Sequence, residues 1–456
     1  MMEIYEIIVI VFLVSFIGSL FLGYPIAWTL GGLSLLFTAG GIVLHDYFGV
    51  DTFLLTRWEN FAIIVDRTWA LMANWLLVAL PMFVYMGLML DRSGVAELMM
   101  TNFVRVFGQL RGGLAITTIL IGILLAASTG IVGASVVLLA TLAMPIMIQQ
   151  NYSKSFASGV VAASGTLGIL VPPSIMLVIM ADQLSLAVGD LFMGALMPGV
   201  MLGFLYLVYV IVVGWIRPEL APAPPLRHKP TAREIWGAVL ATVPTALLIV
   251  CVLGSIFAGV ATPSEASGLG AFGATLLAAA NGRLNLKVIR QVGIETSLTS
   301  AFIFGIFLGA TAFALVMRSL GGDEFIGHML KGLPFGPNGI LIFILFLTFV
   351  AGFFLDWLEI VLIILPLVAP VVKELGYNLI WFLVVFAVCL QTSFLTPPVG
   401  FSLFYMKGVV PPGVTTKHIY YGVIPFVIIQ LVAVAIVFLW PELVLWLPRK
   451  VYGSVG

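Results

Sequence analysis

The stretch Ser164-Gly-Thr-Leu-Gly-Ile-Leu-Val-Pro172-Pro173-Ser174 breaks an apolar segment with a double proline, and Gln391-Thr-Ser-Phe-Leu-Thr-Pro397-Pro398-Val-Gly400 does so again. Proline removes a backbone donor and clashes with the preceding turn, so neither stretch continues as a regular helix. A membrane helix with such a break must satisfy the freed backbone groups with protein, water, an ion or a ligand. Two breaks at corresponding places in two halves of a chain indicate a transporter binding site.

The composition is that of a membrane protein. Of the 456 residues, 62% are hydrophobic and only 9% are charged, which is far from the composition of soluble domains. Apolar runs long enough to cross a bilayer recur from end to end, so the lipid bilayer is the expected environment. Positive and negative side chains balance at a net charge of zero, and no nucleic-acid partner is expected.

The two halves of the chain repeat one pattern at a constant offset, which is the separation of the two double prolines. Four pairs coincide at this shift: Pro145 with Pro370, Tyr152 with Tyr377, Pro172 with Pro397, and Pro173 with Pro398. An odd number of predicted crossings separates the two copies, which inverts the second copy in the membrane. Prolines in apolar sequence could coincide by chance, but four anchors at one offset favour a repeat and an alternating-access design.

Two further apolar stretches, near 113–148 and 338–373, are too long for one membrane helix and too short for two. Each has a small or polar interruption in its middle, which predicts a re-entrant helical hairpin. The predicted fold class is therefore an all-α polytopic membrane protein, like known ion transporters. It contains an inverted repeat with two re-entrant hairpins and two broken helices.

Hydroxyl and glycine residues concentrate at the hairpin tips and the breaks. Hydroxyl and carbonyl oxygens suit a hard cation such as sodium, and flexible glycine backbone can turn carbonyls toward it. The alternative is that these small residues only let membrane helices pack closely. For the paired clusters an ion site is the favoured interpretation. The predicted sodium ligands are Ser128, Thr129, Gly130, Ser164, Gly165, Thr166, Gly352, Gln391, Thr392, Ser393 and Thr396.

The second hairpin carries two acids, Asp356 and Glu359, three residues apart on one helical face. Acids within membrane segments are costly and usually functional. Asp356 could hold sodium, accept a substrate hydroxyl or carry a proton. The alternative places both acids at the membrane surface, and it weighs more for Glu359 than for Asp356.

The sequence lacks the motifs of several other classes. There is no Walker phosphate loop, so this chain uses no ATP. The four histidines and two cysteines have no metal-ligand spacing, and no nucleophile arrangement suggests an enzyme. No cofactor is expected apart from sodium as coupling ion. An intramembrane enzyme or a channel remains the alternative from another class.

The chain resembles the large membrane subunit of tripartite ATP-independent periplasmic (TRAP) transporters, the DctM family. Four stretches carry the resemblance, and the match extends over nearly the whole length: Gly165–Ser174, Ala261–Ala266, Gly352–Pro370 and Gln391–Gly400. The resemblance implies a sodium-coupled importer of organic acids. It also implies two partners, a smaller membrane subunit of about four helices and a periplasmic solute-binding protein, and a place in the bacterial inner (cytoplasmic) membrane.

The family resemblance also implies an elevator-type transport domain, in which hairpin tips and broken helices form the substrate site. Carried onto this sequence, the substrate-binding residues are Ser135, Pro172, Pro173, Asp356, Pro397 and Pro398. The form Asp356-Trp357-Leu358-Glu359 resembles a subgroup associated with 2-oxo acids, lactate or related monocarboxylates. A standalone ion-coupled carrier of the same fold, without a binding protein, is the alternative function.

The predicted domain organisation follows from the repeat and the family fold. It comprises N-terminal scaffold helices (1–68), the first repeat (69–181, with a hairpin at about 113–148 and a broken helix at about 155–181), connecting scaffold helices (182–292), the second repeat (293–410, with a hairpin at about 338–373 and a broken helix at about 378–408), and a C-terminal scaffold helix (411–456). The loop 215–233 is rich in arginine and lysine, which predicts a cytoplasmic location.

Overall fold

The computed structural model describes residues 3–108, 110–129, 132–223 and 230–453, with the side chains of 126–129 left out. Helices account for all the regular structure in these ranges. The chain divides by its internal contacts into two compact units. Unit 1 comprises Met1–Trp75 and Thr299–Leu379, and unit 2 comprises Leu76–Leu298 and Ile380–Gly456.

Unit 1 is built around aromatic side chains from its N-terminal helices and the end of a long helix. Phe12 lies 4.4 Å from Phe313 and 4.8 Å from Phe37, measured between ring centroids. The helices of this unit are α1 (Ile4–Leu20), α2 (Ile26–Phe48), α3 (Trp58–Ala73), the last part of α13 (Leu286–Ser319), α14 (Gly322–Lys331), α15 (Pro337–Ala351), α16 (Trp357–Glu359), the π-helical turn η3 (Ile360–Ile364) and α17 (Leu365–Glu374).

Unit 2 contains both broken helices and the first hairpin. Its helices are η1 (Trp75–Val78), α4 (Ala79–Arg92), α5 (Val95–Phe107), α6 (Gly113–Thr129), α7 (Val132–Gln149), α8 (Lys154–Thr166), η2 (Leu167–Ile169), α9 (Ile175–Gln183), α10 (Val188–Ile216), α11 (Ala232–Phe257), α12 (Pro263–Ala280), the start of α13, α18 (Leu379–Leu395), α19 (Phe401–Lys407), α20 (Thr416–Leu439) and α21 (Glu442–Tyr452).

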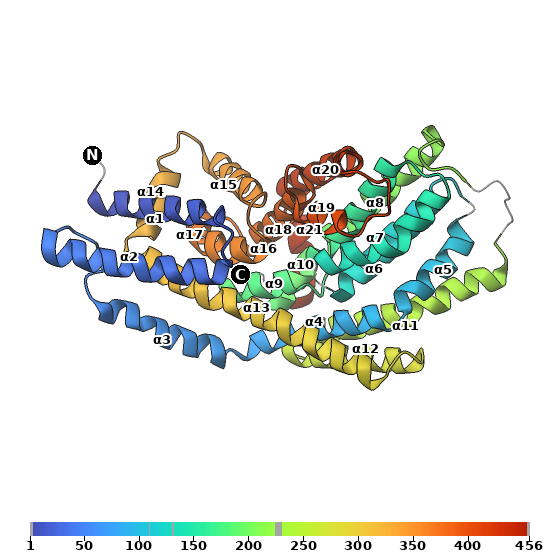
Figure 1. Cartoon of the computed structure of the whole chain (residues 1–456), viewed down its shortest axis with the longest axis horizontal. Coiled ribbons are helices and arrows are strands. Elements are labelled where there is room, and N and C mark those ends of the chain that lie inside the picture. Colours follow the sequence, from blue (N-terminus) through green and yellow to red (C-terminus); the bar gives the residue numbers. More distant parts are fainter. Residues whose placement is uncertain (1–2, 109, 130–131, 224–229, 454–456) are drawn as a thin grey trace. The chain divides into compact units, whose positions relative to one another are not determined.

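Two helix pairs organise unit 2. Helix α4 runs beside α12, and α8 runs beside α20 (Figure 1). Two glycines bring α8 and α20 into backbone contact, because a Cβ atom on Gly159 would lie only 2.0 Å from the carbonyl oxygen of Gly422. The indole nitrogen of Trp381 on α18 donates to the carbonyl of Val437 on α20 over 2.9 Å. Helix α20 is thereby fixed to both broken helices.

Many helices have the length and composition of membrane spans. Within the described ranges, seven helices are long and apolar enough to cross a membrane, and four shorter ones of 10 to 17 residues are also apolar. The shorter group includes α15 and the first part of α6, which are arms of the two predicted hairpins.

The secondary structure repeats at the predicted offset. Helices α6 and α7 form the first hairpin, and α15 with α16 to α17 forms the second. The shift that carries Pro172 onto Pro397 also carries α7 onto the segment that runs from the start of α16 to the end of α17. The same shift carries the first residue of α8 onto the first residue of α18. The predicted all-helical fold with two hairpins and two broken helices is confirmed. The finer division into scaffold and repeat domains stays a prediction.

Candidate functional site

The two double prolines lie in corresponding helix breaks of unit 2. Helix α8 ends at Thr166, and α9 begins only at Ile175, while α18 ends at Leu395 and α19 begins at Phe401. In both breaks the peptide bond between the two prolines is cis. Because regular helix stops at Thr166 and at Leu395, each broken helix leaves main-chain groups without the helical partners that regular structure would supply.

Serine hydroxyls bind corresponding carbonyl groups in the two breaks. Ser174 Oγ donates to the carbonyl of Ile169 over 2.7 Å, and Ser402 Oγ donates to that of Phe394 over 2.5 Å. The two acceptors are separated by the repeat offset, so they occupy the same position in the two copies. A further carbonyl, that of Pro398, accepts from the Tyr420 hydroxyl over 2.6 Å. These three oxygens are thus bound by protein side chains.

The broken helices meet through their polar side chains. Gln391 Nε2 on α18 donates to Thr166 Oγ1 on α8 over 3.2 Å, and both residues are fully buried. The other amide atom of Gln391, Oε1, is buried and has no hydrogen-bond partner. Such an atom costs about 1–3 kcal/mol if nothing binds it. It is therefore a free acceptor in the interior of unit 2.

The hydroxyl groups near this contact share one hydrogen-bonding pattern. Each donates its proton to a carbonyl three or four residues earlier in its own helix, so its oxygen offers only lone pairs to any other group. The residues with this pattern are Ser164, Thr166, Thr392, Ser393 and Thr396. Lone pairs without an available proton suit a cation rather than an anion.

The first hairpin packs directly on both broken helices. A Cβ atom on Gly165 would lie 2.8 Å from the Cα atom of Val136 in α7, and one on Gly122 in α6 would lie 2.7 Å from Cβ of Ser164. A Cβ atom on Gly133 would lie 3.0 Å from the ring of Tyr405 in α19. Both arms of the hairpin therefore contact α8, and its second arm contacts α19.

Unit 2 brings most of the predicted ligands onto two neighbouring helices, but their surroundings differ. Ser135 is buried in α7, and Pro172 and Pro173 are buried, whereas Pro397 is half-buried and Pro398 is exposed. Gly130 and the side chains of Ser128 and Thr129 lie outside the described residues. Their predicted sodium contacts stay predictions.

Gly352 and Asp356 belong to unit 1. Gly352 ends α15, its N–H donating to the Thr348 carbonyl over 3.0 Å, and Asp356 is the N-cap residue of α16. Asp356 is half-buried, and Glu359 is 4% exposed with its Oε2 atom buried and without a hydrogen-bond partner. Glu359 is thus enclosed by protein, while its depth in the membrane stays a prediction. The roles assigned to Gly352 and Asp356 stay predictions.

Two buried residues beside the Thr166–Gln391 contact were missed by the sequence analysis. The Tyr206 hydroxyl on α10 lies next to the side chains of Thr166 and Gln430, and all three residues are fully buried. Neither the Tyr206 hydroxyl nor the two amide atoms of Gln430 form a hydrogen bond of normal geometry. A single tyrosine or glutamine in an apolar run does not by itself indicate a binding site. Its neighbours come from other helices, so the sequence does not show which polar groups it meets.

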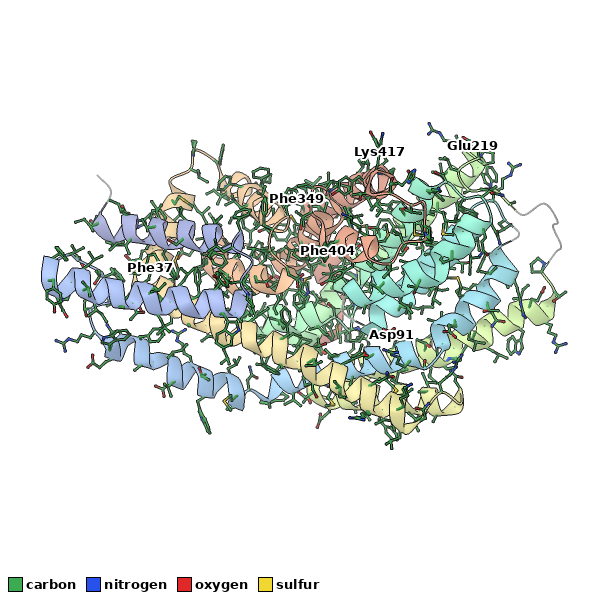
Figure 2. The ribbon with its side chains drawn as sticks, viewed as in Figure 1. Phe37, Asp91, Glu219, Phe349, Phe404 and Lys417 are labelled. Atoms are coloured by element: carbon green, nitrogen blue, oxygen red, sulfur yellow. The ribbon has the colours of Figure 1, made fainter. Side chains whose placement is uncertain are left out.

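A lysine near the second double proline was also missed. Lys417, at the N-terminal end of α20 (Figure 2), lines a pocket of about 410 Å³ together with Pro397, Tyr420 and Tyr421. Its ammonium group lies 5.8 Å from the centre of the Tyr421 ring. The sequence analysis gave Lys417 no role, because nothing in its spacing along the chain connects it with the double proline.

Paired hairpins, paired broken helices and a buried polar contact between equivalent residues are the architecture of secondary transporters, a class of multi-pass membrane protein. The match to a family model is specific. Residues 13–443 fit the family described as "Tripartite ATP-independent periplasmic transporter, DctM component". The chain belongs to this family. The resemblance found in the sequence, and the prediction of a transporter rather than an enzyme, are thereby confirmed.

Similar proteins cover nearly the whole chain. The C4-dicarboxylate TRAP transporter large permease protein DctM of Pseudomonas aeruginosa is 30% identical over 88% of this chain and 92% of that protein. The isethionate TRAP transporter permease protein DctMQ of Oleidesulfovibrio alaskensis is 28% identical over 86% of this chain but only 59% of that longer protein.

The fold is also found among solved structures. The crystal structure of the YdaH transporter from Alcanivorax borkumensis matches with a TM-score of 0.59, covering 84% of this chain and 88% of that one. The sequence identity is 15%, so the likeness concerns the fold alone.

Proposed function

We propose that this large permease subunit carries out sodium-coupled secondary uptake of a small organic acid across the bacterial inner membrane. The contact between Gln391 and Thr166 carries the proposal. It joins the two broken helices at equivalent positions and leaves an unpartnered amide oxygen, Gln391 Oε1, among hydroxyl oxygens that have already donated their protons. An arrangement of neutral oxygens suits sodium.

The substrate class is inferred from chemistry and from the relatives. The permeases named for C4-dicarboxylate and isethionate both act on organic anions. We infer a carboxylate for this chain, and the Asp356-Trp357-Leu358-Glu359 form favours a 2-oxo acid or another monocarboxylate. Sodium would supply the positive charge that balances the carboxylate, with Asp356 accepting a substrate hydroxyl or a proton.

Two protein partners are part of the proposal. The family name describes a tripartite periplasmic system, which fits a periplasmic solute-binding protein and a small membrane subunit of about four helices. DctMQ extends well beyond the part that this chain matches, which fits a small subunit fused to the large one. An elevator movement of the broken helices with their hairpins is the proposed transport step.

Reconstitution tests the function directly. The large and small subunits would be placed in liposomes, and uptake of labelled acid would be measured with substrate-loaded binding protein under an inward sodium gradient. Candidate substrates would include lactate, a 2-oxo acid and a C4-dicarboxylate. We expect uptake to stop when choline replaces sodium or when the binding protein is left out.

Each failure identifies a different error. Uptake that continues without a sodium gradient would disprove the coupling, whereas sodium-driven uptake without binding protein would favour the standalone carrier. Transport of none of the three acid classes, with an intact and folded complex, would reject the substrate class.

A further inference from the structure

A charged cavity of about 530 Å³ lies in unit 2 beside the first hairpin. One wall is the end of α4 and the start of α5, with Asp91, Arg92 and Glu97, and the wall is completed by Arg283 and Glu295. Figure 2 labels Asp91 near the end of α4. None of these residues belongs to the predicted sodium or substrate sets.

The opposite wall is a single face of the hairpin arm α7. The lining residues Ala134, Val137, Leu138 and Thr141 follow helical spacing, so they lie on one side of that helix. Thr141 Oγ1 donates to the carbonyls of Val137 and Leu138, at 3.0 and 2.9 Å, and keeps its lone pairs. Helix α7 therefore adds a hydroxyl oxygen to the lining of the cavity but no charge.

The charges around the cavity do not balance. Arg92 pairs with Glu295 at 2.9 Å, and Arg283 pairs with Glu97 at 3.1 Å. Asp91 is the third carboxylate, and its Oδ1 atom is shielded from solvent and has no hydrogen-bond partner. The neighbouring guanidinium, that of Arg92, is already bonded to Glu295. One negative charge is therefore left without a paired cation.

A carboxylate at the end of a membrane helix is costly unless something compensates its charge. We propose that Asp91 and the cavity against α7 form a binding site for a sodium ion, distinct from the ligands on the two broken helices. This proposal rests on the proposed sodium coupling. It adds a second binding site for the coupling ion, next to helix α7, the hairpin arm that packs on α8.

The charges that line the cavity favour a monovalent ion. No group of three or more acidic, histidine or cysteine side chains in the described part of the chain is arranged to hold a metal. Glu97 and Glu295 are occupied by arginines, so Asp91 supplies the only unpaired charge among the residues that line the cavity, with Thr141 and water as neutral oxygen ligands. A multivalent cation would need more carboxylates than this.

Two readouts test the site in the complex of large and small subunits. The first is the sodium concentration for half-maximal uptake into liposomes. The second is the sodium-dependent rise in the thermal unfolding temperature in detergent, with choline chloride holding the ionic strength constant, because an ion that binds only the folded state raises its stability. Asp91→Asn removes the charge at almost constant size, and Thr141→Val removes the neutral ligand. Asp323→Asn is the control, since it removes an exposed acid that pairs with Arg318 in unit 1.

We expect Asp91→Asn to raise the half-maximal sodium concentration about tenfold or more and to reduce the thermal shift, as loss of a metal-site residue does. Thr141→Val should raise it less, and Asp323→Asn should leave both readouts as in the wild type. Unchanged sodium responses in both cavity variants would overturn the site. So would an Asp91→Asn variant that loses only a response to pH, because the site would then hold a proton. A wild-type complex that ignores sodium would instead reject the proposed coupling.

Discussion

Gln391 Nε2 donates to Thr166 Oγ1 over 3.2 Å, and these two residues occupy the same position in the two repeats, 225 residues apart. Equivalent residues of a two-fold repeat can touch only where the copies meet. The contact therefore marks the junction of the two broken helices inside unit 2. The pair is also asymmetric, since an amide and a hydroxyl occupy the equivalent positions and only the amide leaves an atom unpartnered.

A double-mutant cycle on this pair should reveal a direct interaction. Thr166→Val removes the acceptor and leaves the Gln391 amide buried without a partner, so we expect a loss of about 1–3 kcal/mol in the free energy of unfolding. Adding Gln391→Leu should restore part of that loss, since both polar groups are then gone. The measurement is reversible denaturant unfolding in detergent micelles, and strictly additive losses would contradict the contact.

Gly165→Ala should separate the first hairpin from α8. The new Cβ atom would lie 2.3 Å from a side-chain carbon of Val136 and 2.8 Å from its Cα atom, so the backbone of α7 must move. We expect a lower thermal unfolding temperature and strongly reduced sodium-driven uptake. Gly268→Ala is the matched control, because that helical glycine of unit 2 has nothing within 4 Å of an added Cβ atom. Equal effects in both variants would refute the close packing of hairpin and helix.

The serines that bind the carbonyls in the breaks should be important in both repeats. Ser174→Ala and Ser402→Ala each leave a carbonyl, that of Ile169 or Phe394, without its hydroxyl donor. We expect each to lower the free energy of unfolding by about 1–3 kcal/mol. Ser297→Ala removes an exposed helical serine and should cost much less. Equal free energies of unfolding for the three variants would show that other groups bind the carbonyls of Ile169 and Phe394.

The two acids of the second hairpin should differ in their effect on transport. Asp356→Asn removes the half-buried N-cap carboxylate of α16, and we expect uptake to fall at least about tenfold if this group contacts substrate or ion. Glu359→Gln keeps the shape of a side chain that is buried, and we expect only a small change in uptake. Initial rates at saturating sodium, normalised to the amount of folded complex, provide the comparison. A larger loss of uptake for Glu359→Gln than for Asp356→Asn would show that Glu359, and not Asp356, is the acid that transport requires.

The hairpins and breaks could be predicted because local features define them. An apolar stretch such as 338–373 is too long for one crossing, and the double proline at Pro397 cannot continue a helix, whatever the rest of the chain does. The constant offset between the two double prolines then predicted the correspondence of α7 with α16 to α17.

The partners of the polar residues could not be predicted in the same way. Thr166 meets Gln391 and Tyr206 from two other helices, and Tyr206 in turn meets Gln430. No spacing in the sequence relates Tyr206 or Gln430 to Thr166. The sequence analysis gave Asp91 no role, and its unpaired charge becomes evident only when Arg92 is seen bonded to Glu295.

The sequence by itself determined the class of protein, the repeat, and the two breaks with their hydroxyl residues, because these depend on apolar length, proline and composition along the chain. Only the tertiary structure decided which oxygens are already bound, as at Ile169 and Phe394, and which are free, as at Gln391. A hydrogen-bond partner is chosen by proximity in space, and helix packing brings together residues far apart in the chain. Availability for an ion is therefore a property of the fold.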